Sequence, residues 1–318
     1  MNSPRSFVAD SLREGGSIPG LDQAPAFSLH ESAASPIPVL IAVPHAGRTY
    51  PSALVGAMRD AEFAAIRLED RYADHLGEAV AEATGAALLI ARAPRAMIDL
   101  NRAADDIDWD MIEPIATSRA LATPAPGRRA RSGLGLIPRR LPGLGEIWSR
   151  RLGAVELEAR IRAVHEPYHR LIEEIMAELT ARWGAALLLD LHSMPPLPLH
   201  SGGAAPAEFV LGDRFGSACD GGLVGAAFAW FAEAGRRAAH NRPYAGGYAL
   251  ERHAAPRRGH HALQVEVDRR SYLDACLAEP GEGLAETATV LAELVRRLAA
   301  EVALLGSQRG SCWPVAAE

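Results

Sequence analysis

The chain contains Val39-Leu40-Ile41-Ala42-Val43-Pro44-His45-Ala46-Gly47, an apolar run that ends abruptly in a proline, a histidine and a glycine. A second run, Leu187-Leu188-Leu189-Asp190-Leu191-His192-Ser193, also carries a histidine at its end. Short apolar runs of this kind are typical of buried strands in a sheet that helices cover on both faces. Ligand-binding groups of open α/β sheets gather beyond the carboxyl ends of the strands. We therefore expect His45 and His192 to meet at one edge of a sheet.

Further apolar runs alternate with helical patterns. We expect strands at 86–91, 96–100, 208–211 and 262–267, and helices over 60–84, 147–183 (kinked or split at Pro167) and 282–305. This alternation predicts an α/β fold, a single domain with a central mixed, largely parallel sheet flanked by helices. Residues 1–36 are rich in Ser, Pro and Gly, and we expect an irregular N-terminal arm there, with the folded domain over residues 37–318.

Composition excludes several classes of protein. The 318 residues are 48% hydrophobic and 23% charged, which is ordinary for a globular protein with a full core. A net charge of −6 argues against a nucleic-acid partner. No apolar stretch approaches the length of a membrane span, and Met1–Gly20 lacks the pattern of a signal peptide. We expect a soluble, cytoplasmic protein with no membrane partner.

The three cysteines, Cys219, Cys276 and Cys312, have the spacing of neither a zinc knuckle nor a disulfide framework. We expect reduced thiols, so any bound metal must be held by histidine and carboxylate ligands.

The two histidines are candidate metal ligands. Asp190 lies two residues before His192, where a carboxylate can select the imidazole tautomer. A catalytic zinc takes three protein ligands, and Asp70 or its neighbour Glu69 is a candidate third. The alternatives are hydrogen-bonded structural histidines and an acidic helix start favoured by the helix dipole. Two similar histidines at strand ends favour ligation, of zinc or of cobalt or iron.

The segment Arg95-Ala96-Met97-Ile98-Asp99-Leu100-Asn101-Arg102 brackets an apolar stretch with two arginines and an asparagine. Arginine binds a carboxylate through two parallel hydrogen bonds, and an asparagine adds another. These side chains are therefore candidates to bind an anionic ligand. The alternative is a salt bridge within the segment, to Asp99 or to Asp105.

Glu266 lies in the otherwise apolar strand expected at 262–267 and shares a face with Gln264. A carboxylate inside such a strand is costly unless it has a partner. Glu266 thus faces either water on an edge strand or a polar cavity, where it would be a general base. His261, just before the strand, is a candidate to join it.

Three further features are weaker indications of a functional site. Residues 241–248 form a glycine-containing loop that either approaches a ligand closely or is a plain turn. His165 and His169 are four residues apart but lack the His-Glu-x-x-His pattern, so we interpret them as supporting or packing residues. The basic loop over 123–145 is either an anion-binding patch or, more commonly for such charge runs, a solvated loop. Its length makes it a candidate for a flap at the active site.

In this order, the segments resemble the N-formylglutamate amidohydrolase family. The resemblance covers roughly residues 38 to 275. It rests on the segments Val43–Gly47, Glu69–Asp70, Arg95 with Ile98–Arg102, Glu166–His169, Asp190–Ser193, Leu211–Gly212, Cys219–Asp220, Asn241–Tyr248 and His261–Glu266. The family resembles the zinc carboxypeptidases and aspartoacylases, which implies a phosphorylase/hydrolase-like fold. Its members cleave N-formylglutamate to formate and glutamate in histidine catabolism.

The resemblance implies roles for individual residues. The related enzymes bind zinc through a His-x-x-Glu pair and a later histidine, but Arg48 stands three residues after His45 here. The resemblance therefore moves the carboxylate ligand to Asp70, giving a zinc site of His45, Asp70 and His192. It makes Glu266 the general base and Arg95 the support of the oxyanion. The implied substrate-binding residues are Asn101, Arg102, Asn241, Tyr244, Gly246 and His261.

The chain departs from the better-known deformylases between Ala103 and Trp148, and Arg71 replaces an aromatic residue. We expect metal-assisted hydrolysis of a small N-acyl amino acid, with residues 37–318 as the catalytic domain. The alternatives are a deacylase for another acyl group and a non-catalytic carboxylate-binding protein. The sequence leaves the acyl group, the metal and the oligomeric state open.

Overall fold

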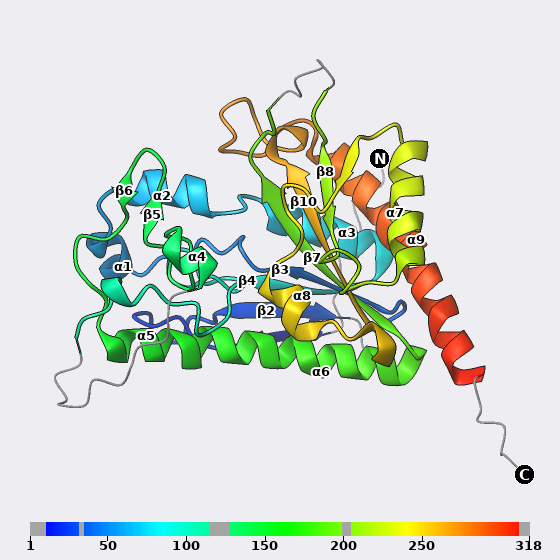
Figure 1. Cartoon of the computed structure of the whole chain (residues 1–318), viewed down its shortest axis with the longest axis horizontal. Helices are drawn as coiled ribbons and strands as arrows, with labels where there is room; N and C mark the ends of the chain where they lie inside the picture. Colours follow the sequence, from blue (N-terminus) through cyan, green and yellow to red (C-terminus); the bar gives the residue numbers. More distant parts are fainter. Residues whose placement is uncertain (1–10, 32–34, 115–126, 199–204, 312–318) are drawn as a thin grey trace, which may run out of the picture.

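A mixed eight-stranded sheet forms the centre of the protein, as seen in a computed structural model that describes residues 11–31, 35–114, 127–198 and 205–311 (Figure 1). The strand order is β1 (Ser11–Gly15), β2 (Phe27–Glu31), β4 (Ala87–Ala91), β3 (Val39–Val43), β7 (Ala186–Met194), β10 (His260–Asp268), β8 (Phe209–Gly212) and β9 (Ala238–His240). The four central strands β4, β3, β7 and β10 are parallel, whereas β2 and β8 run antiparallel to them. This confirms the predicted α/β fold with a mixed sheet.

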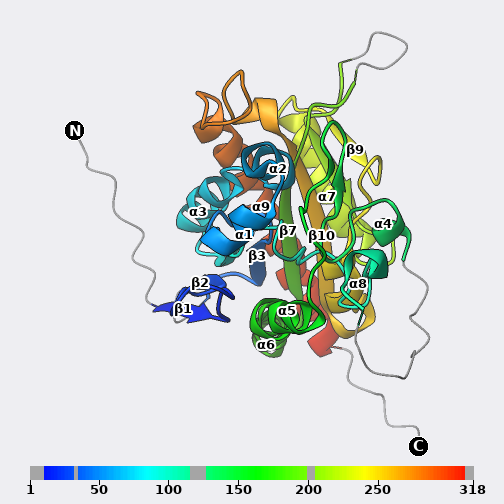
Figure 2. The ribbon, with the colours of Figure 1, turned by 90° about the vertical axis from the view of Figure 1, so that its left-hand side faces the viewer.

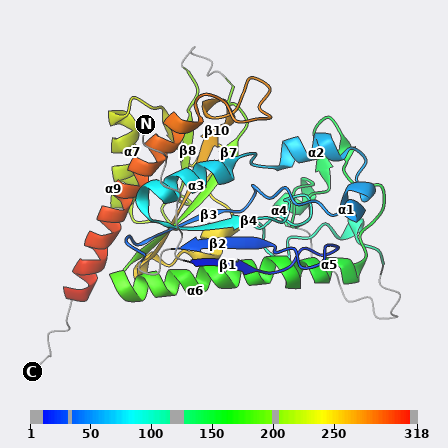
Figure 3. The same cartoon turned by 180° about the vertical axis from the view of Figure 1, so that it is seen from behind.

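Helices cover both faces of this sheet. On one face, α3 (Ala73–Thr84), α7 (Gly221–Glu233) and α9 (Leu284–Ser311) bury the alternate side chains Val39, Ile41 and Val43 of β3 (Figure 3). On the other face, Leu40 and Ala42 pack into a second core with residues of α6 (Glu166–Trp183). Both sets of side chains are fully buried, which explains why β3 is apolar at every position.

The register of the central strands sets the position of the candidate residues. Ala42 of β3 pairs with Asp190 of β7, and His192 of β7 pairs with Glu266 of β10. His45 follows β3 by two residues, so His45, His192 and Glu266 reach the same edge of the sheet. His192 lies inside β7 rather than beyond it, because this strand continues to Met194.

The N-terminal segment differs from the expected irregular arm. Residues 11–15 and 27–31 form the antiparallel pair β1 and β2, which extends the sheet beside α6 (Figure 2). Arg13 of β1 contacts Glu174 of α6 at 3.7 Å. The strand β1 is largely exposed, so it lacks the apolar pattern that would predict a strand. Residues 1–10 and 32–34 of the expected arm lie outside the described residues.

Two expected elements have other boundaries or do not form. The helix expected over 60–84 is divided into α2 (Ala61–Leu68) and α3, and Asp70 lies between them. Residues 96–100 do not form a strand. Ala96, Met97 and Ile98 are nevertheless buried in turns. Ala96 packs in a cluster with residues of α2, and Met97 and Ile98 pack in the core that includes residues of α6. The expected strands at 86–91, 208–211 and 262–267 and the last helix are present.

The long helix begins at α5 (Ala154–Arg160) and passes through a π-helical turn, η2 (Ile161–His165), into α6. Glu166 N–H donates to the carbonyl of Ile161, five residues earlier. Pro167 has no N–H, so it cannot bond the carbonyl of Ala163. That carbonyl instead accepts a 2.9 Å hydrogen bond from Ser17 N–H, which fastens the N-terminal segment to the helix. Pro167 therefore coincides with a π turn rather than a break.

The remaining elements are short. They are α1 (Ser52–Ala57), η1 (Trp109–Met111), α4 (Arg128–Arg131), β5 (Arg140–Leu141), β6 (Gly145–Glu146), α8 (Tyr248–His253), η3 (Pro256–Arg258) and η4 (Arg269–Ser271). Within the described ranges, no helix is long and apolar enough to cross a membrane. Cys219 is buried and Cys276 exposed, both as free thiols, and Cys312 lies outside the described residues.

Candidate active site

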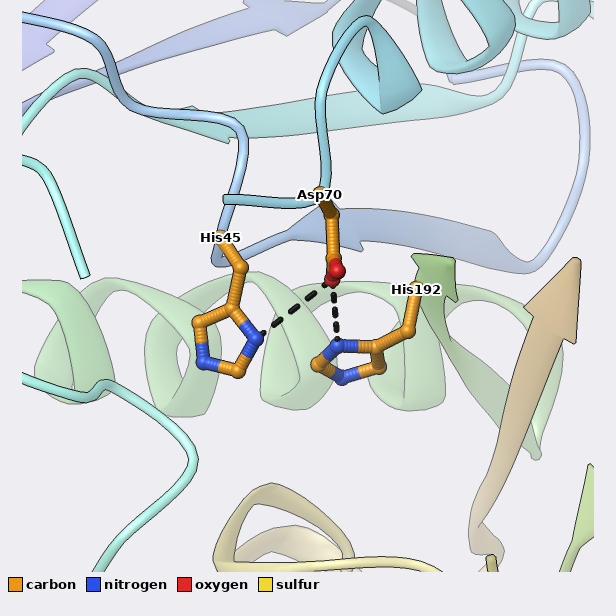
Figure 4. A group of neighbouring side chains, drawn as sticks. All are labelled: His45, Asp70 and His192. Atoms are coloured by element: carbon orange, nitrogen blue, oxygen red, sulfur yellow. Dashed lines mark hydrogen bonds and ion pairs between the residues drawn. The ribbon is translucent and has the colours of Figure 1, made fainter. Parts of the chain in front are cut away.

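His45, Asp70 and His192 converge at the edge of the sheet (Figure 4). Their candidate ligand atoms all lie within 4.8 Å of one another, and all three residues are buried. Asp70 Oδ2 is 3.4 Å from His45 Nδ1 and 3.0 Å from His192 Nδ1. Each residue comes from a different part of the chain: the turn after β3, the loop between α2 and α3, and β7. Two imidazole nitrogens and a carboxylate are the donors of a catalytic zinc site.

The second nitrogen of each imidazole is bound to a carboxylate. His45 Nε2 lies 2.8 Å from Asp99 Oδ1, and His192 Nε2 lies 2.9 Å from Asp190 Oδ2. A carboxylate accepts, so each Nε2 carries a proton, and when the ring is neutral its Nδ1 lone pair is left for a cation next to Asp70. This is the arrangement in which an outer carboxylate orients a metal-binding histidine.

His45 Nδ1 is buried and makes no hydrogen bond to any described residue. A lone pair on Nδ1 facing a carboxylate oxygen is repulsive unless a proton or a cation lies between them. These residues therefore fit a divalent cation.

The charges of this cluster depend on its neighbours. Burial disfavours an ionised Asp70, but the 3.0 Å hydrogen bond from His192 lowers its pKa well below the usual value. Burial likewise opposes ionisation of Asp99, but the charge of Arg95 lowers its pKa well below the usual value. Burial opposes a charged His192, whereas Asp190 raises its pKa. In the protein without metal, a proton on His192 thus occupies the position that a cation would take.

Glu69 is excluded as a ligand by its contacts. Its carboxylate accepts hydrogen bonds from Tyr50 Oη at 2.8 Å and from Arg71 Nη1 at 3.1 Å. Glu69 is not part of the cluster, whose carboxylate is that of Asp70. Arg71, which stands where an aromatic residue was expected, thus holds the neighbouring carboxylate in place.

Glu266 faces a polar cavity. Its strand β10 lies between β7 and β8, so the alternative of an edge strand is wrong. Gln264 Nε2 donates a 2.8 Å hydrogen bond to Glu266 Oε1. Burial raises the pKa of Glu266, the charge of His192 opposes this and the charge of Asp70 adds to it, so that the pKa is about 8. A buried carboxyl group beside the metal cluster has the position of a general base.

A cavity of about 290 Å³, called the inner cavity below, contains this cluster. Its lining includes the three candidate ligands, Glu266, Gln264, Tyr244 and Gly246. It also includes five arginines: Arg67, Arg95, Arg102, Arg129 and Arg269. This concentration of positive charge in a protein of net charge −6 indicates an anionic ligand.

Residues 37–273 match the family model described as N-formylglutamate amidohydrolase. The chain belongs to this family. The N-formylglutamate deformylase of Pseudomonas aeruginosa is 30% identical over 271 residues, covering 83% of this chain and 93% of that protein. The crystal structure of N-formylglutamate amidohydrolase from Ralstonia eutropha JMP134 is 34% identical, with a TM-score of 0.77 over 90% of this chain and 99% of that one. A gene product of Agrobacterium tumefaciens shares the fold at 21% identity, with a TM-score of 0.64.

In this member of the family, the side-chain amide of Asn101 forms hydrogen bonds with other residues of the protein. Its Nδ2 lies 3.3 Å from both Asp190 Oδ2 and Gln264 Oε1, and its Oδ1 accepts a 2.9 Å hydrogen bond from Ala249 N–H. Asn101 therefore connects β7, β10 and α8 beside the cavity. It lines the cavity, but its amide hydrogen bonds are used within the scaffold.

The two arginines of the Arg95–Arg102 segment keep donors available. Arg95 Nε donates to Asp99 Oδ2 at 2.9 Å. Arg102 Nε and Nη1 donate to the carbonyls of Leu134 and Asn101, at 2.9 and 2.7 Å. Arg102 Nη2 has no hydrogen-bond partner among the described residues, so it is available to a ligand in the inner cavity. The salt bridge to Asp99 considered from the sequence exists for Arg95 at 2.9 Å and for Arg102 at 3.8 Å, and both arginines still line the cavity.

Three side chains of the long helix hold this segment. Arg160 Nη1, His165 Nε2 and His169 Nε2 each donate a 2.9 Å hydrogen bond to a backbone carbonyl. The acceptors are Met97, Arg102 and Leu100. The two histidines were predicted to be supporting or packing residues, but their spacing in the sequence does not reveal which segment they hold. Arg160 carries no sequence signal for this role and was not predicted.

Asn241 and His261 do not line the inner cavity. Asn241 Oδ1 accepts from Asp213 N–H at 3.0 Å, and its Nδ2 donates to Asp213 Oδ1 at 2.7 Å. His261 Nδ1 accepts a 3.3 Å hydrogen bond from Asp220 N–H. Both residues therefore make hydrogen bonds within the protein outside the cavity, and their contact with substrate stays a prediction. Tyr244 and Gly246, from the same loop as Asn241, do line the cavity.

Proposed function

We propose that this chain cleaves the N-formyl amide of an acidic amino acid, N-formyl-L-glutamate, to formate and glutamate. As a family member, it is a hydrolase that acts on an amide bond. One observation carries the proposal: the His45, Asp70 and His192 cluster shares a cavity with Glu266 and five arginines. Relatives named N-formylglutamate deformylase in two Pseudomonas species support the substrate.

We assign His45 Nδ1, His192 Nδ1 and the Asp70 carboxylate as ligands of zinc, or of another divalent ion such as cobalt or iron. When bound, such a cation polarises the amide carbonyl and lowers the pKa of a water from about 15.7 towards 7. Asp99 and Asp190 keep the two imidazoles in the tautomer that ligation requires.

Glu266 is the proton carrier of the proposed reaction. It accepts a proton from the attacking water as the new C–O bond forms at the formyl carbon. It then delivers that proton to the leaving nitrogen as the C–N bond breaks, which yields formate and the free amine of glutamate. Gln264 orients Glu266 through the 2.8 Å hydrogen bond to its Oε1.

Arg95 and Arg102 each interact with a negative charge of the substrate. Arg95 lines the cavity and, held by Asp99, stabilises the negative charge that develops on the amide oxygen. Arg102 binds a substrate carboxylate through Nη2, since its Nε and Nη1 are occupied. Tyr244 and Gly246 complete the wall around the substrate.

Formate release from N-formyl-L-glutamate tests the proposal. Purified protein is assayed as isolated, after chelation, and after zinc is restored, with metal content measured by elemental analysis. We expect activity that disappears on chelation and returns with metal. N-Acetyl and longer N-acyl glutamates serve as competing substrates. Faster hydrolysis of an acetyl or longer amide would make the chain a deacylase of another acyl group. A fully metal-loaded protein that hydrolyses none of them would refute the enzymatic proposal.

A further inference from the structure

We propose that Arg129 determines substrate specificity by binding the side-chain carboxylate of the acidic amino acid. This inference rests on the proposed function and adds a residue from the region where the chain departs from its better-known relatives. Arg129 belongs to the short helix α4 within the basic loop, of which residues 123–126 lie outside the described part of the chain.

Arg129 stands at a boundary between two cavities. The outer cavity, of about 380 Å³, is adjacent to the inner one. Both are lined by Asn101, Arg102, Arg129, Gly246 and Gly247. A ligand group at the boundary of the two cavities is therefore next to both Arg102 and Arg129.

The guanidinium of Arg129 is available for a ligand. Its side chain makes no hydrogen bond or ion pair with any residue in the described ranges. Other arginines of the inner cavity have such partners: Arg95 is bound to Asp99, and Arg269 donates to Ser193 at 3.1 Å and to the carbonyl of Glu69.

The arginine charges near the boundary repel one another. Burial lowers the pKa of Arg102, Asp99 opposes this, and the charges of Arg95 and Arg129 lower the pKa further. Arg129 is thus close enough to destabilise the positive charge of Arg102. A ligand with two carboxylates relieves this repulsion by giving each arginine a counter-charge.

The backbone that carries Arg129 is anchored. Ala130 is fully buried, and its N–H donates a 3.2 Å hydrogen bond to Asp106 Oδ1. Leu134 N–H donates to the carbonyl of Arg129 at 2.9 Å, and the carbonyl of Leu134 accepts from Arg102 Nε. The two arginines are therefore connected through one short loop, which fixes their relative position. An anchored arginine loses less entropy on binding than one on a free flap.

The outer cavity also limits the length of the substrate. Asp105, Asp106, Glu251 and Arg214 line the outer cavity but not the inner one, and Arg214 is paired with Glu251 at 3.0 Å. A carboxylate placed beyond Arg129 would meet Asp105 and Asp106, which have no ion-pair partner in the described ranges, and like charges disfavour one another. The favoured position for the second carboxylate is the boundary, at Arg129.

Arg129→Gln tests the proposal with two substrates, N-formyl-L-glutamate and its uncharged counterpart N-formyl-L-glutamine. We expect the wild-type protein to prefer the glutamate derivative. In Arg129→Gln, kcat/KM for that derivative should fall roughly ten- to a hundredfold, because a charge-assisted contact is lost. The value for the glutamine derivative should change little. Arg129→Lys should lie between the two, since lysine retains the charge without the paired donors.

Arg131→Gln is the matched control, because Arg131 lies on the same short helix and is exposed like Arg129 but lines neither cavity. Its substrate preference should equal that of the wild type. If the wild type hydrolyses N-formyl-L-glutamate and Arg129→Gln keeps the wild-type preference, the role of Arg129 is overturned while the proposed function stands.

If the wild type releases no formate from either compound, the proposed reaction fails and binding decides the role of Arg129. Calorimetric titration with L-glutamate and L-glutamine measures that role without turnover. Weaker glutamate binding in Arg129→Gln, with unchanged glutamine binding, supports the role. Equal loss for both ligands, or no loss for either, overturns it.

Discussion

His45 Nε2 and Asp99 Oδ1 lie 2.8 Å apart, and both residues are buried. The second oxygen of Asp99 accepts from Arg95 Nε at 2.9 Å, and Asp99 Oδ1 also accepts from Asn101 N–H at 2.8 Å. One carboxylate thus sets the tautomer of a candidate metal ligand, positions a cavity arginine and closes the turn between them. The metal cluster and the anion-binding side chains are therefore mechanically connected through Asp99.

Asp99→Asn tests this connection. An asparagine keeps an acceptor for His45 but loses the charge that favours the imidazole and holds Arg95. We expect zinc affinity to fall roughly ten- to a hundredfold, as for other residues that orient metal ligands. Competition with a chromophoric chelator measures this affinity. Asp110→Asn is the control, since that side chain is 89% exposed. Unchanged zinc affinity in Asp99→Asn would contradict the orienting role.

Glu266→Gln separates proton transfer from metal binding. The variant retains shape but cannot accept a proton, so we expect kcat to fall by about a hundredfold or more. Its metal content should equal that of the wild type, because Glu266 is not among the three clustered ligands. Steady-state kinetics with elemental analysis provide both measurements. Near-normal kcat in the metal-loaded variant would exclude Glu266 as the base.

His165→Ala tests how the long helix positions Arg102. Without the imidazole of His165, the carbonyl of Arg102 loses its 2.9 Å hydrogen bond. Arg102, which we assign to the substrate carboxylate, is then held less firmly. We expect KM for N-formyl-L-glutamate to rise severalfold with zinc content unchanged. Arg162→Ala on the same π-helical turn is the control, since Arg162 is 63% exposed. A variant that loses stability while KM stays constant would limit His165 to a packing role.

Buried neutral histidines should make the fold sensitive to acid. Burial lowers the pKa of His253 to about 3, and burial also lowers the pKa of His169 well below 6.5. His253 Nε2 donates to His169 Nδ1 at 2.9 Å, and His169 Nε2 donates to the carbonyl of Leu100, a chain that requires neutral rings.

The unfolded chain takes up protons near pH 6.5, whereas the folded protein does not until far lower pH. The contribution of these neutral histidines to the free energy of unfolding is therefore fully present above pH 6.5. It is lost as the pH falls towards 3, by up to about 1.4 kcal/mol per pH unit for each histidine. Urea unfolding at pH 7 and pH 5 measures this loss. His253→Gln keeps a donor for His169 but does not titrate, so its free energy of unfolding should depend less on pH. An identical pH dependence in the two proteins would be inconsistent with a neutral His253.

Elements whose burial leaves a local pattern in the sequence were predictable, and those that depend on distant contacts were not. The strands β3, β7 and β10 were predictable because each is buried on both faces and therefore apolar. The hairpin of β1 and β2 was missed because β1 is mostly exposed and lacks that signal. The strand predicted at residues 96–100 was wrong, because the apolar residues 96–98 are buried in turns and not in a strand.

By itself the amino-acid sequence determined the α/β class, the central strands and the residue types available for a metal site. These follow from local periodicity and from chain order, which one sequence records directly. Tertiary structure alone decided that Asp70 and not Glu69 joins the histidines, that Asn241 and His261 lie outside the cavity lining, and that Arg129 is part of it. The reason is physical: each of these outcomes depends on contacts between side chains far apart in the chain, and the orientation of a side chain is set by its partners in space.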